Sequence, residues 1–416
     1  MSFTPVSTEP SVPVESHLQR VLAAIEPLPP YDQPLLEALG LPACERIASP
    51  MDLPAFDNSG MDGYAVVLDD VVTASDEDPV TLPVVGESAA GQAKLYAMSP
   101  GTAVKIMTGA PVPTGADAVV PVEWTDGGSA TVRILKAPRH GQHVRRQGED
   151  VRAGDVLLEE DAILGPRQVG LLASVGKAQV RSRPRPRVVI LSTGSELREP
   201  GTKLAPDAIY DSNSFMLAGA VRGTGAIAYR VGVVPDDPAQ LSDALSDQLV
   251  RADMVVTSGG VSKGEYDVVK EVLSQLGTVW FGEVRMQPGK PQGFGHIGED
   301  RIPIFALPGN PVSAYVSFEL FVLPALRKMM GRTPLSRPTL RARLTESFRS
   351  AHGKTQLVRA RYGSDERGIH VAPVGGHGSH LLGDLSDANA IIVVPPETDL
   401  ARVDSVVEIL TLDREF

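Results

Sequence analysis

Three polar runs, each placed after a strand-like segment rich in β-branched residues, could together bind a phosphorylated ligand and a metal ion. They are residues 191–197 (LSTGSEL), 257–267 (TSGGVSKGEYD) and 307–313 (LPGNPVS). Glycine lets backbone N–H groups approach a ligand closely, and the N-termini of helices favour anions. Carboxylates stand at Glu196, Glu265 and Asp267, and carboxylates beside a phosphate are typical of a Mg²⁺ site.

The expected fold brings these runs together. In an open parallel sheet, the loops that connect strands to helices collect at one edge, where ligands bind. Neither TSGGVSKGEYD nor LPGNPVS is a P-loop, because the pattern GxxxxGK[ST] is absent. An acid at the start of a helix also complements the helix dipole, so Glu265 or Asp267 alone has a structural explanation. The candidate substrate-binding residues of the three runs are Ser192, Thr193, Gly194, Ser258, Gly259, Gly260, Ser262, Lys263, Gly264, Gly309, Asn310 and Pro311.

Other loops carry polar side chains that could meet an anion. Asp62 stands among Asx and glycine residues, a composition that is also typical of an ordinary turn. Thr108 could hydrogen-bond an oxyanion, although a turn is the favoured interpretation of that run alone. Arg145 and Arg146 could bind a phosphate or oxyanion in a bidentate manner, and a surface salt-bridge cluster is the alternative. Lys290 lies in the run PGKPQGFG, which we expect to form a loop.

Composition limits the possible partners and location. The 416 residues carry a net charge of −12, which argues against nucleic acid as the main partner. With a single cysteine, one chain can form neither a disulfide framework nor a cysteine-based zinc site. The N-terminal run does not resemble a signal peptide, and no apolar run approaches the length of a membrane span. We therefore expect a cytoplasmic protein with no membrane partner.

Hydrophobic spacing and turn signals divide the chain into regions of different structure. Residues 47–150 contain short alternating runs separated by Gly, Pro and Asp, which predict a small all-β unit. Residues 187–331 alternate strand-like and helical runs and predict a parallel, doubly wound domain. Residues 338–416 are strand-rich again and predict a small barrel or sandwich. Helices are expected at residues 14–26 and from Pro166.

Local signals predict the ends of several elements. Ser212 or Asn213 is expected to cap the helix of the run SNSFMLAGAVRGTG. The run after Asn310 predicts one long helix that is kinked at Pro324 and ends at Gly331. The basic, proline-rich run RSRPRPR is predicted to be a solvated linker.

Taken together, these motifs resemble those of the molybdopterin molybdenumtransferase family, which comprises MoeA in bacteria and the gephyrin E-domain in animals. The matching runs are DNSGMDGYAV, KIMTGAPVP, RRQGED, STGSEL, YDSN, TSGGVSKGEYD, QPGKP, LPGNPVS and HGSH. They occur in family order from Asp57 to His380 and cover nearly the whole chain. Each run alone is unspecific, whereas the set is highly specific.

The resemblance implies a multidomain α/β protein of four subdomains. An elongated α/β segment would comprise residues 14–46 and 151–185, and an inserted β subdomain would comprise 47–150. The doubly wound, mostly parallel sheet domain, which binds molybdopterin, would comprise 186–331. A C-terminal β-barrel would comprise 332–416.

The resemblance also implies the reaction. Adenylylated molybdopterin and molybdate are the substrates, and the phosphoanhydride is cleaved in a step that depends on Mg²⁺ and molybdate. Molybdenum enters the dithiolene and AMP is released. The implied assembly is a homodimer whose site forms across the interface, with molybdopterin adenylyltransferase as a protein partner.

Matching motif positions assigns roles to individual residues. The implied catalytic residues are Asp62, Thr108, Glu196, Asp236 and Asp267. Of these, Glu196, Asp236 and Asp267 would hold the metal, while Pro308 and Pro311 would shape the LPGNP loop. Asp62 and Thr108 would face the acidic edge of the other subunit.

The sequence departs from the family pattern just before PGKP. Glu283 and Gln287 stand where lysines are often found, although Arg285 and Lys290 restore positive charge. Two other functions compete with insertion. The related adenylyltransferase step uses the same doubly wound fold without the flanking β domains, and a divergent paralogue could bind the cofactor as a scaffold without turnover.

Overall fold

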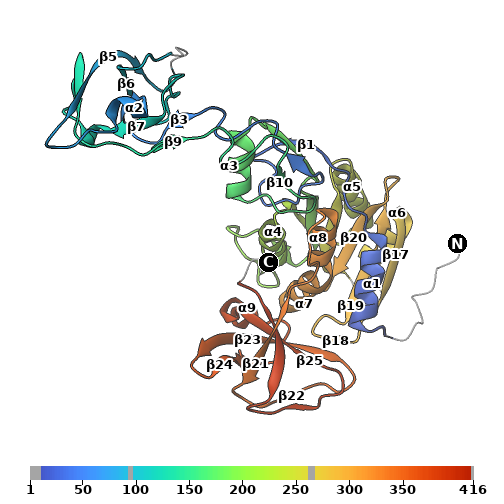
Figure 1. The fold of residues 1–416 in the computed structure, drawn as a ribbon. Coiled ribbons are helices and arrows are strands. Elements are labelled where there is room, and N and C mark those ends of the chain that lie inside the picture. The colour runs from blue at the N-terminus through green and yellow to red at the C-terminus, as the bar shows by residue number, and fades with distance from the viewer. Residues whose placement is uncertain (1–10, 92–96, 261–267, 414–416) are drawn as a thin grey trace. The chain divides into compact units, whose positions relative to one another are not determined.

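The computed structural model describes residues 11–91, 97–260 and 268–413, and its contacts divide the chain into two units. The smaller unit comprises Pro34–Leu39 and Glu45–Val180, and the larger comprises Met1–Gln33, Gly40–Cys44 and Arg181–Phe416. The chain changes unit within β1 (Tyr31–Pro34, labelled in Figure 1) and within β11 (Gln179–Ser182), and on either side of the segment Gly40–Cys44. The boundaries of the four expected subdomains stay a prediction.

The smaller unit contains a five-stranded sheet in the order β7-β4-β6-β5-β8. Strand β4 is buried along its whole length, and Gly63 at its start is required because a Cβ there would lie 2.0 Å from the carbonyl oxygen of Val120. The strands are β4 (Gly63–Val66), β5 (Val80–Ser88), β6 (Ala103–Ile106), β7 (Ala118–Pro121) and β8 (Thr131–Ile134). The predicted strand-rich unit is therefore present.

Shorter elements complete this unit. The pairs β3–β9 and β2–β10 are both antiparallel. The helix expected from Pro166 is α3, with proline in its first turn, where its missing N–H is not needed. The bounds are β2 (Ile47–Ala48), β3 (Asn58–Ser59), α2 (Leu68–Val71), η1 (Val122–Trp124), β9 (Val144–Arg145), β10 (Val156–Leu158) and α3 (Pro166–Ser174).

The larger unit contains the expected doubly wound sheet, in the order β15-β12-β16-β20-β19-β17. The first four strands are parallel, and β19 and β17 extend the sheet with antiparallel pairings. The strands are β12 (Arg187–Thr193), β15 (Ile227–Val234), β16 (Met254–Ser258), β17 (Gly277–Glu283), β19 (Pro291–Ile297) and β20 (Ile302–Leu307). The short strands β13 (Leu197–Arg198), β14 (Ile209–Tyr210) and β18 (Met286–Gln287) lie in its connections.

Helices cover both faces of this sheet. Ile190 of β12 contributes to a core shared with α1, α4, α7 and α8, whereas its neighbours Val189 and Leu191 contribute to a second core shared with α5 and α6. This alternation follows from the two-residue period of a strand. The helices are α1 (Val14–Ala24), α4 (Asn213–Gly223), α5 (Pro238–Leu249), α6 (Val268–Leu276), α7 (Pro311–Ser317) and α8 (Leu323–Met329). In the described ranges, no helix has the length and apolar character of a membrane span.

The run PGKPQGFG is not a loop throughout, as the sequence suggested, because its second half begins β19. Gly293 and Gly295 are strand residues that permit close packing. A Cβ on Gly293 would lie 2.7 Å from the Phe281 ring, and one on Gly295 would lie 2.1 Å from the carbonyl oxygen of Thr278. In this segment glycine therefore marks a close approach between strands rather than a turn.

The prediction of a solvated linker for RSRPRPR is also wrong for two of its four arginines. Arg183 donates to the carbonyl of Leu28, and Arg185 donates to the carbonyl of Gly225, both at 2.6 Å. Both arginines are half-buried. They bind backbone carbonyl groups, which the sequence alone does not reveal.

The helix after Asn310 runs as predicted but is not uniformly α-helical. A π-helical turn, η2 (Phe318–Val322), separates α7 from α8, and Pro324 lies in the first turn of α8. Proline lacks an N–H, and its ring clashes with the carbonyl four residues earlier, here that of Leu320. The wider turn just before Pro324 removes that conflict without ending the helix.

The C-terminal strands, orange to red in Figure 1, form a closed five-stranded barrel. The ring runs β23-β24-β21-β27-β25 and returns to β23 through antiparallel pairing with β25. The strands are β21 (Thr339–Leu344), β23 (Thr355–Asp365), β24 (Gly368–Pro373), β25 (Ala390–Val394) and β27 (Val406–Thr411), and the accessory elements are β22 (Phe348–Arg349), α9 (Leu382–Asp387) and β26 (Leu400–Ala401). Of the two expected alternatives, the barrel is the one present.

Helix α1 places a buried histidine against aromatic rings on the sheet side. The His17 ring centroid lies 5.0 Å from that of Trp280 and 4.6 Å from that of Phe321. Burial, helped by the charge of Arg20, lowers the pKa of His17 from 6.5 to about 4. The imidazole is therefore neutral in the folded protein above that pH.

Gly295→Ala should lower the free energy of unfolding by about 1–3 kcal/mol, because the new methyl group would force β19 away from β17. The matched control is Gly219→Ala in α4, where a Cβ meets no atom within 4 Å and alanine should be neutral or stabilising by up to about 1 kcal/mol. Thermal unfolding of both variants measures the difference. Equal effects would contradict the strand assignment.

Acid should destabilise the fold through His17. Between pH 6.5 and about 4 the unfolded chain binds a proton at this residue that the folded protein does not, so stability falls as the pH falls, by about 3 kcal/mol in total. His17→Phe should remove this part of the pH dependence in urea unfolding curves. His140→Gln, at an exposed position, should leave it unchanged, and an equal change in both variants would refute the assignment.

Candidate functional site

The carboxyl ends of β12, β16 and β20 lie next to one another in the doubly wound sheet. After β12 the chain moves outward to β15, and then returns to β16 on the other side of β12. Such a reversal opens a crevice at the carboxyl ends of the strands, where doubly wound proteins bind ligands. The register pairs Ser192 with Ser258, and Ser258 with Leu307. The starts of the three polar runs are therefore adjacent.

Glycines allow these loops to touch. Gly259 has a φ of +104°, and a Cβ there would lie 2.6 Å from the carbonyl oxygen of Thr193. A Cβ on Gly309 would lie 3.6 Å from the Cα of Gly259. The backbones after β12, β16 and β20 thus approach one another closely, and Gly309 and Asn310 are exposed. This arrangement leaves peptide groups accessible at the edge of the sheet.

Two predicted acidic ligands lie at this edge. The N–H of Ser195 donates to Asp236 at 3.1 Å, and the carboxylate of Glu196 lies close to Gly194, where a Cβ would be 2.7 Å from Oε2. Both acids are exposed. The loop after β12 therefore carries Glu196 and binds Asp236 through the preceding residue, although the two acids stand 40 residues apart in the sequence.

Part of the second run lies outside the described residues. The predicted site residues affected are Ser262, Lys263, Gly264 and Asp267, together with Glu265. Within the described ranges, no group of three His, Cys, Asp or Glu side chains could hold a metal ion. Glu196 and Asp236 offer oxygen ligands of the kind that Mg²⁺ prefers, and the ion commonly keeps several waters.

The YDSN segment, which the site prediction left out, holds the loops in place. The hydroxyl of Ser192 donates to Asp211 at 2.9 Å, and Nδ2 of Asn213 donates to the hydroxyl of Ser258 at 2.6 Å. All four side chains are buried. The two serines predicted to bind substrate are thus each engaged by a neighbouring loop, and their contact with substrate stays a prediction.

Asp211 also provides the side-chain cap of α4, instead of Ser212 or Asn213. It accepts a hydrogen bond of 3.1 Å from the N–H of Ser214, whereas Ser212 at the N-cap position makes no side-chain cap bond. In the sequence, Asp and Asn before a helix indicate only capping. These residues could therefore be recognised as possible helix caps, but the sequence did not show that they also bind neighbouring loops.

A positively charged side chain lies next to the YDSN segment. Arg230 forms two hydrogen bonds of 2.8 Å with Glu199 and lies 3.8 Å from Asp211. Its guanidinium carbon lies 4.0 Å from the Phe215 ring centroid. Hydrogen bonding to Arg230 lowers the pKa of Glu199, against a smaller opposing effect of burial. Arg230 thus balances the charge of the buried Asp211.

Lys290 immediately precedes β19, whose first residues run beside the end of β20, and it is paired with an acid. Its Nζ lies 2.8 Å from Oε2 of Glu283, one of the two residues that depart from the family pattern. The preceding Gly289 packs against α7, since a Cβ there would lie 3.0 Å from the hydroxyl of Ser317. Lys290 is therefore positioned near the edge, with its charge partly balanced by Glu283.

In the smaller unit, Asp62 and Thr108 form a pair. The backbone N–H and the hydroxyl of Thr108 donate to the same oxygen of Asp62, at 2.6 and 2.9 Å. These two bonds, the backbone one first, lower the pKa of Asp62. Both residues are exposed, so the ionised carboxylate is held in a fixed position at the surface.

The two predicted arginines lie near this pair. The backbone pairing of β3 with β9 sets Arg145 opposite Asn58, and Arg146 donates to Asp57 at 2.6 Å. Asp57 also accepts from the N–H of Gln147, and these bonds lower its pKa, the one from Gln147 most. Arg146 is thus in an ion pair, as the alternative interpretation of this run proposed.

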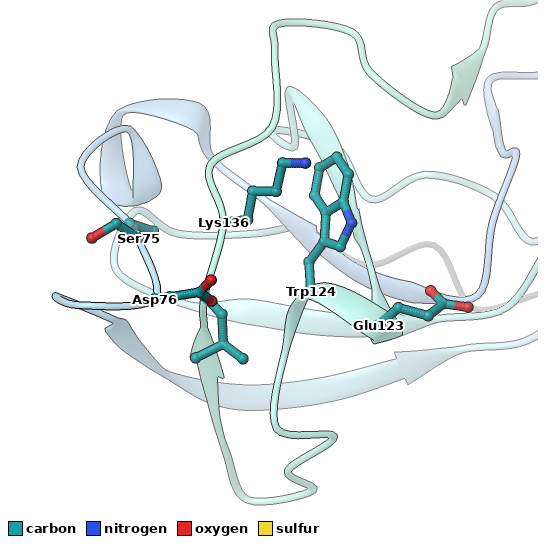
Figure 2. Close-up of a pocket in the computed structure, with 7 residues that line it drawn as sticks. Ser75, Asp76, Glu123, Trp124 and Lys136 are labelled. Carbon is teal, nitrogen blue, oxygen red and sulfur yellow. The ribbon is translucent and has the colours of Figure 1, made fainter.

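A surface hollow of about 410 Å³ also lies in the smaller unit (Figure 2). It is lined by Ala74, Ser75, Asp76, Glu123, Trp124, Leu135 and Lys136. Lys136 lies over the Trp124 ring, with Nζ 4.1 Å from the centroid, and Glu123 points away from Asp76. The two acids therefore do not face each other, and none of the predicted site residues lines this hollow.

The fold and the edge site together define a class: a doubly wound ligand-binding domain joined to a small barrel and an inserted β unit. Family profiles match in the same order. The profile of the MoeA N-terminal region (domain I and II) covers residues 12–176. A probable molybdopterin binding domain covers 189–328, and the MoeA C-terminal region (domain IV) covers 341–412.

Similar proteins agree with this assignment. Molybdopterin molybdenumtransferase 2 of Mycobacterium tuberculosis is 45% identical over 390 residues, covering 92% of this chain and 95% of that protein. Molybdopterin molybdenumtransferase 1 of the same organism is 38% identical, covering 96% and 98%. The solved structure of a molybdopterin biosynthesis MoeA protein from Pyrococcus horikosii matches with a TM-score of 0.79 and 31% identity, covering 98% of this chain and 100% of that one. The chain belongs to the MoeA family of molybdopterin molybdenumtransferases.

Thr108→Val should raise the pKa of Asp62 toward its ordinary value, because the hydroxyl bond is lost while the backbone bond remains. Thr108→Ser keeps the hydroxyl and should retain the low pKa. NMR titration of the Asp62 side-chain carboxyl measures the change. An identical pKa in the wild type and the valine variant would contradict the hydrogen-bonded pair.

Proposed function

We propose that this protein inserts molybdenum from molybdate into adenylylated molybdopterin, with cleavage of the phosphoanhydride and release of AMP. Membership of the MoeA family supports a molybdopterin molybdenumtransferase acting in molybdenum cofactor biosynthesis. The observation that carries the proposal is the meeting of three glycine-containing loops, after β12, β16 and β20, beside the carboxylates of Glu196 and Asp236. Such an edge suits a ligand that carries several phosphates.

The residues would divide the work by their chemistry. Backbone N–H groups of the loops and the Lys290 ammonium would bind the phosphate oxygens. Glu196 and Asp236, joined by Asp267 from the segment outside the described residues, would hold Mg²⁺. When bound, the ion would neutralise charge that develops on the anhydride oxygens. The exposed positions of Glu196 and Asp236 leave room for the waters that Mg²⁺ commonly keeps.

Asp62 and Thr108 would act on a second copy of the chain. As part of the same proposal, two copies form a homodimer, and Asp62 and Thr108 of one copy complete the acidic edge of the other. The fixed, ionised carboxylate of Asp62 supports a role in accepting a hydrogen bond from a water molecule at that edge and so orienting it. A molybdopterin adenylyltransferase would supply the substrate, and both proteins would act in the cytoplasm.

AMP release from adenylylated molybdopterin tests the function. With Mg²⁺ present, the purified protein should release AMP only when molybdate is added. Asp236→Asn should lower kcat/KM on the order of a hundredfold, because a charged oxygen at the edge is lost. The matched control is the neighbouring Asp237→Asn, which keeps the cap on the N–H of Gln240 and should retain activity.

Two results would overturn the proposal. Tight binding of adenylylated molybdopterin without AMP release under any oxyanion would indicate a scaffold. Formation of adenylylated molybdopterin from ATP would indicate the adenylyltransferase step instead.

A further inference from the structure

Two buried carboxamides hold two of the loops at the predicted binding edge. Asn213 and Gln292 each donate from the side-chain nitrogen to one glycine carbonyl and one serine hydroxyl. Asn213 donates to the carbonyl of Gly309, and Gln292 donates to the carbonyl of Gly289, each at 2.6 Å. Both side chains are more than nine-tenths buried. Neither residue was a predicted site residue.

The orientation of the Asn213 carboxamide follows from its partners. A backbone carbonyl only accepts hydrogen bonds, so the amide nitrogen must face Gly309, and it reaches the hydroxyl of Ser258 at 2.6 Å as well. The oxygen Oδ1 is buried without a hydrogen-bond partner. Leaving a buried polar atom unpartnered is unfavourable. The bonds through Nδ2 are therefore maintained at a cost in stability, as is typical of functional sites.

Gln292 makes the same two kinds of hydrogen bond at another loop, the one that precedes β19. It lies in β19 and donates to the hydroxyl of Ser317 at 2.6 Å as well as to Gly289. Gly289 has a φ of +95°, a conformation that glycine adopts readily. The side chain thus fixes the PGKP turn against α7, immediately before Lys290.

Holding a glycine carbonyl also aims the next backbone N–H. In a planar trans peptide the C=O and the following N–H point in opposite directions. With the carbonyls of Gly309 and Gly289 turned toward buried carboxamides, the N–H groups of Asn310 and Lys290 turn the other way. Neither N–H donates a hydrogen bond to another residue of the described ranges. Each is therefore a donor that no described residue occupies.

We propose that Asn213 and Gln292 are positioning residues that aim the backbone N–H groups of Asn310 and Lys290 at an anionic oxygen of the substrate. This rests on the proposed function, which brings a phosphorylated ligand and an oxyanion to the same edge. A donor fixed before binding does not have to be ordered when the ligand arrives, so it contributes more to affinity than a mobile one.

The chain contains a matched control for this arrangement. Gln33 is a buried carboxamide that donates to the carbonyl of Ser182 at 2.9 Å and to the hydroxyl of the same residue at 2.7 Å. It therefore makes the same two kinds of hydrogen bond, and it is no part of the predicted site. Replacing it removes equivalent bonds without touching the loops of the edge.

The test replaces each carboxamide by an apolar side chain of similar volume. Asn213→Leu and Gln292→Met should raise the KM for adenylylated molybdopterin about tenfold, the effect of losing one hydrogen bond to a charged group, with a smaller change in kcat. Gln33→Met should lower the melting temperature about as much as the two site variants do, but it should change KM less than about twofold. Ser317→Ala keeps the bond to Gly289 and should also leave KM nearly unchanged. If Asn213→Leu does not fold, Asn213→Ala is used instead.

A second readout separates positioning from general damage. AMP and adenosine are tested as competitive probes, because they differ by a phosphate group. The two site variants should weaken AMP about tenfold and leave adenosine unchanged. Equal weakening of both probes, or equal KM changes in the Gln33 variant, would overturn the proposal.

This outcome remains distinct from failure of the proposed function. If the wild type releases no AMP, the insertion reaction is refuted, and equilibrium binding of adenylylated molybdopterin decides the roles of Asn213 and Gln292. Wild-type affinity in both site variants would then refute positioning. About tenfold weaker binding in both, with Gln33→Met unaffected, would support it.

Discussion

The close approach of three backbone segments at the carboxyl edge of the doubly wound sheet is the constraint on which the rest of the site depends. The pairing of Ser192 with Ser258 brings the ends of β12 and β16 together, and Gly259 removes the side chain that would collide with Thr193. Peptide groups can then line a binding surface. Helices packed on both faces fix the strands and leave this edge accessible.

Buried polar side chains maintain that approach. Backbone turns alone would not fix the distances between loops that belong to different βα units. Asp211 binds Ser192 at the end of β12, and Asn213 binds both Ser258 and Gly309. The YDSN segment therefore joins all three loops. Arg230, which is paired with Glu199, lies 3.8 Å from Asp211 of this segment. Glu196 and Asp236 stand on exposed loops, and these hydrogen bonds fix the framework beneath them.

Much of this fold could be predicted from the sequence because its signals are local. Alternation of strands and helices predicted the doubly wound domain, and period-two runs predicted the strands of the barrel. The errors arose where a residue type has two uses. Glycine in PGKPQGFG indicated a loop, whereas Gly293 and Gly295 serve strand packing. Arginines in RSRPRPR indicated solvation, whereas Arg183 and Arg185 bind carbonyl groups of distant residues.

The positions of the candidate site residues could be predicted where motif and loop coincide, and less well where they depend on tertiary contacts, while their roles stay predictions. Glu196 and Asp236 lie at one edge as the motifs implied. The proposed roles of Asn213 and Gln292 depend on partners far away in the sequence, the carbonyl of Gly309 and the hydroxyl of Ser317, so no local pattern indicates them. Likewise, the pairing of Lys290 with Glu283 depends on the geometry of the turn.

The most direct test of the central claim is the position of molybdenum in crystals of the protein soaked with Mg²⁺, molybdate and adenylylated molybdopterin. Anomalous diffraction at the molybdenum edge locates the metal independently of the rest of the ligand. The account predicts one strong peak at the carboxyl ends of β12, β16 and β20, close to the loops that carry Gly259 and Gly309. A peak confined to the hollow beside Trp124, or inside the C-terminal barrel, would contradict it.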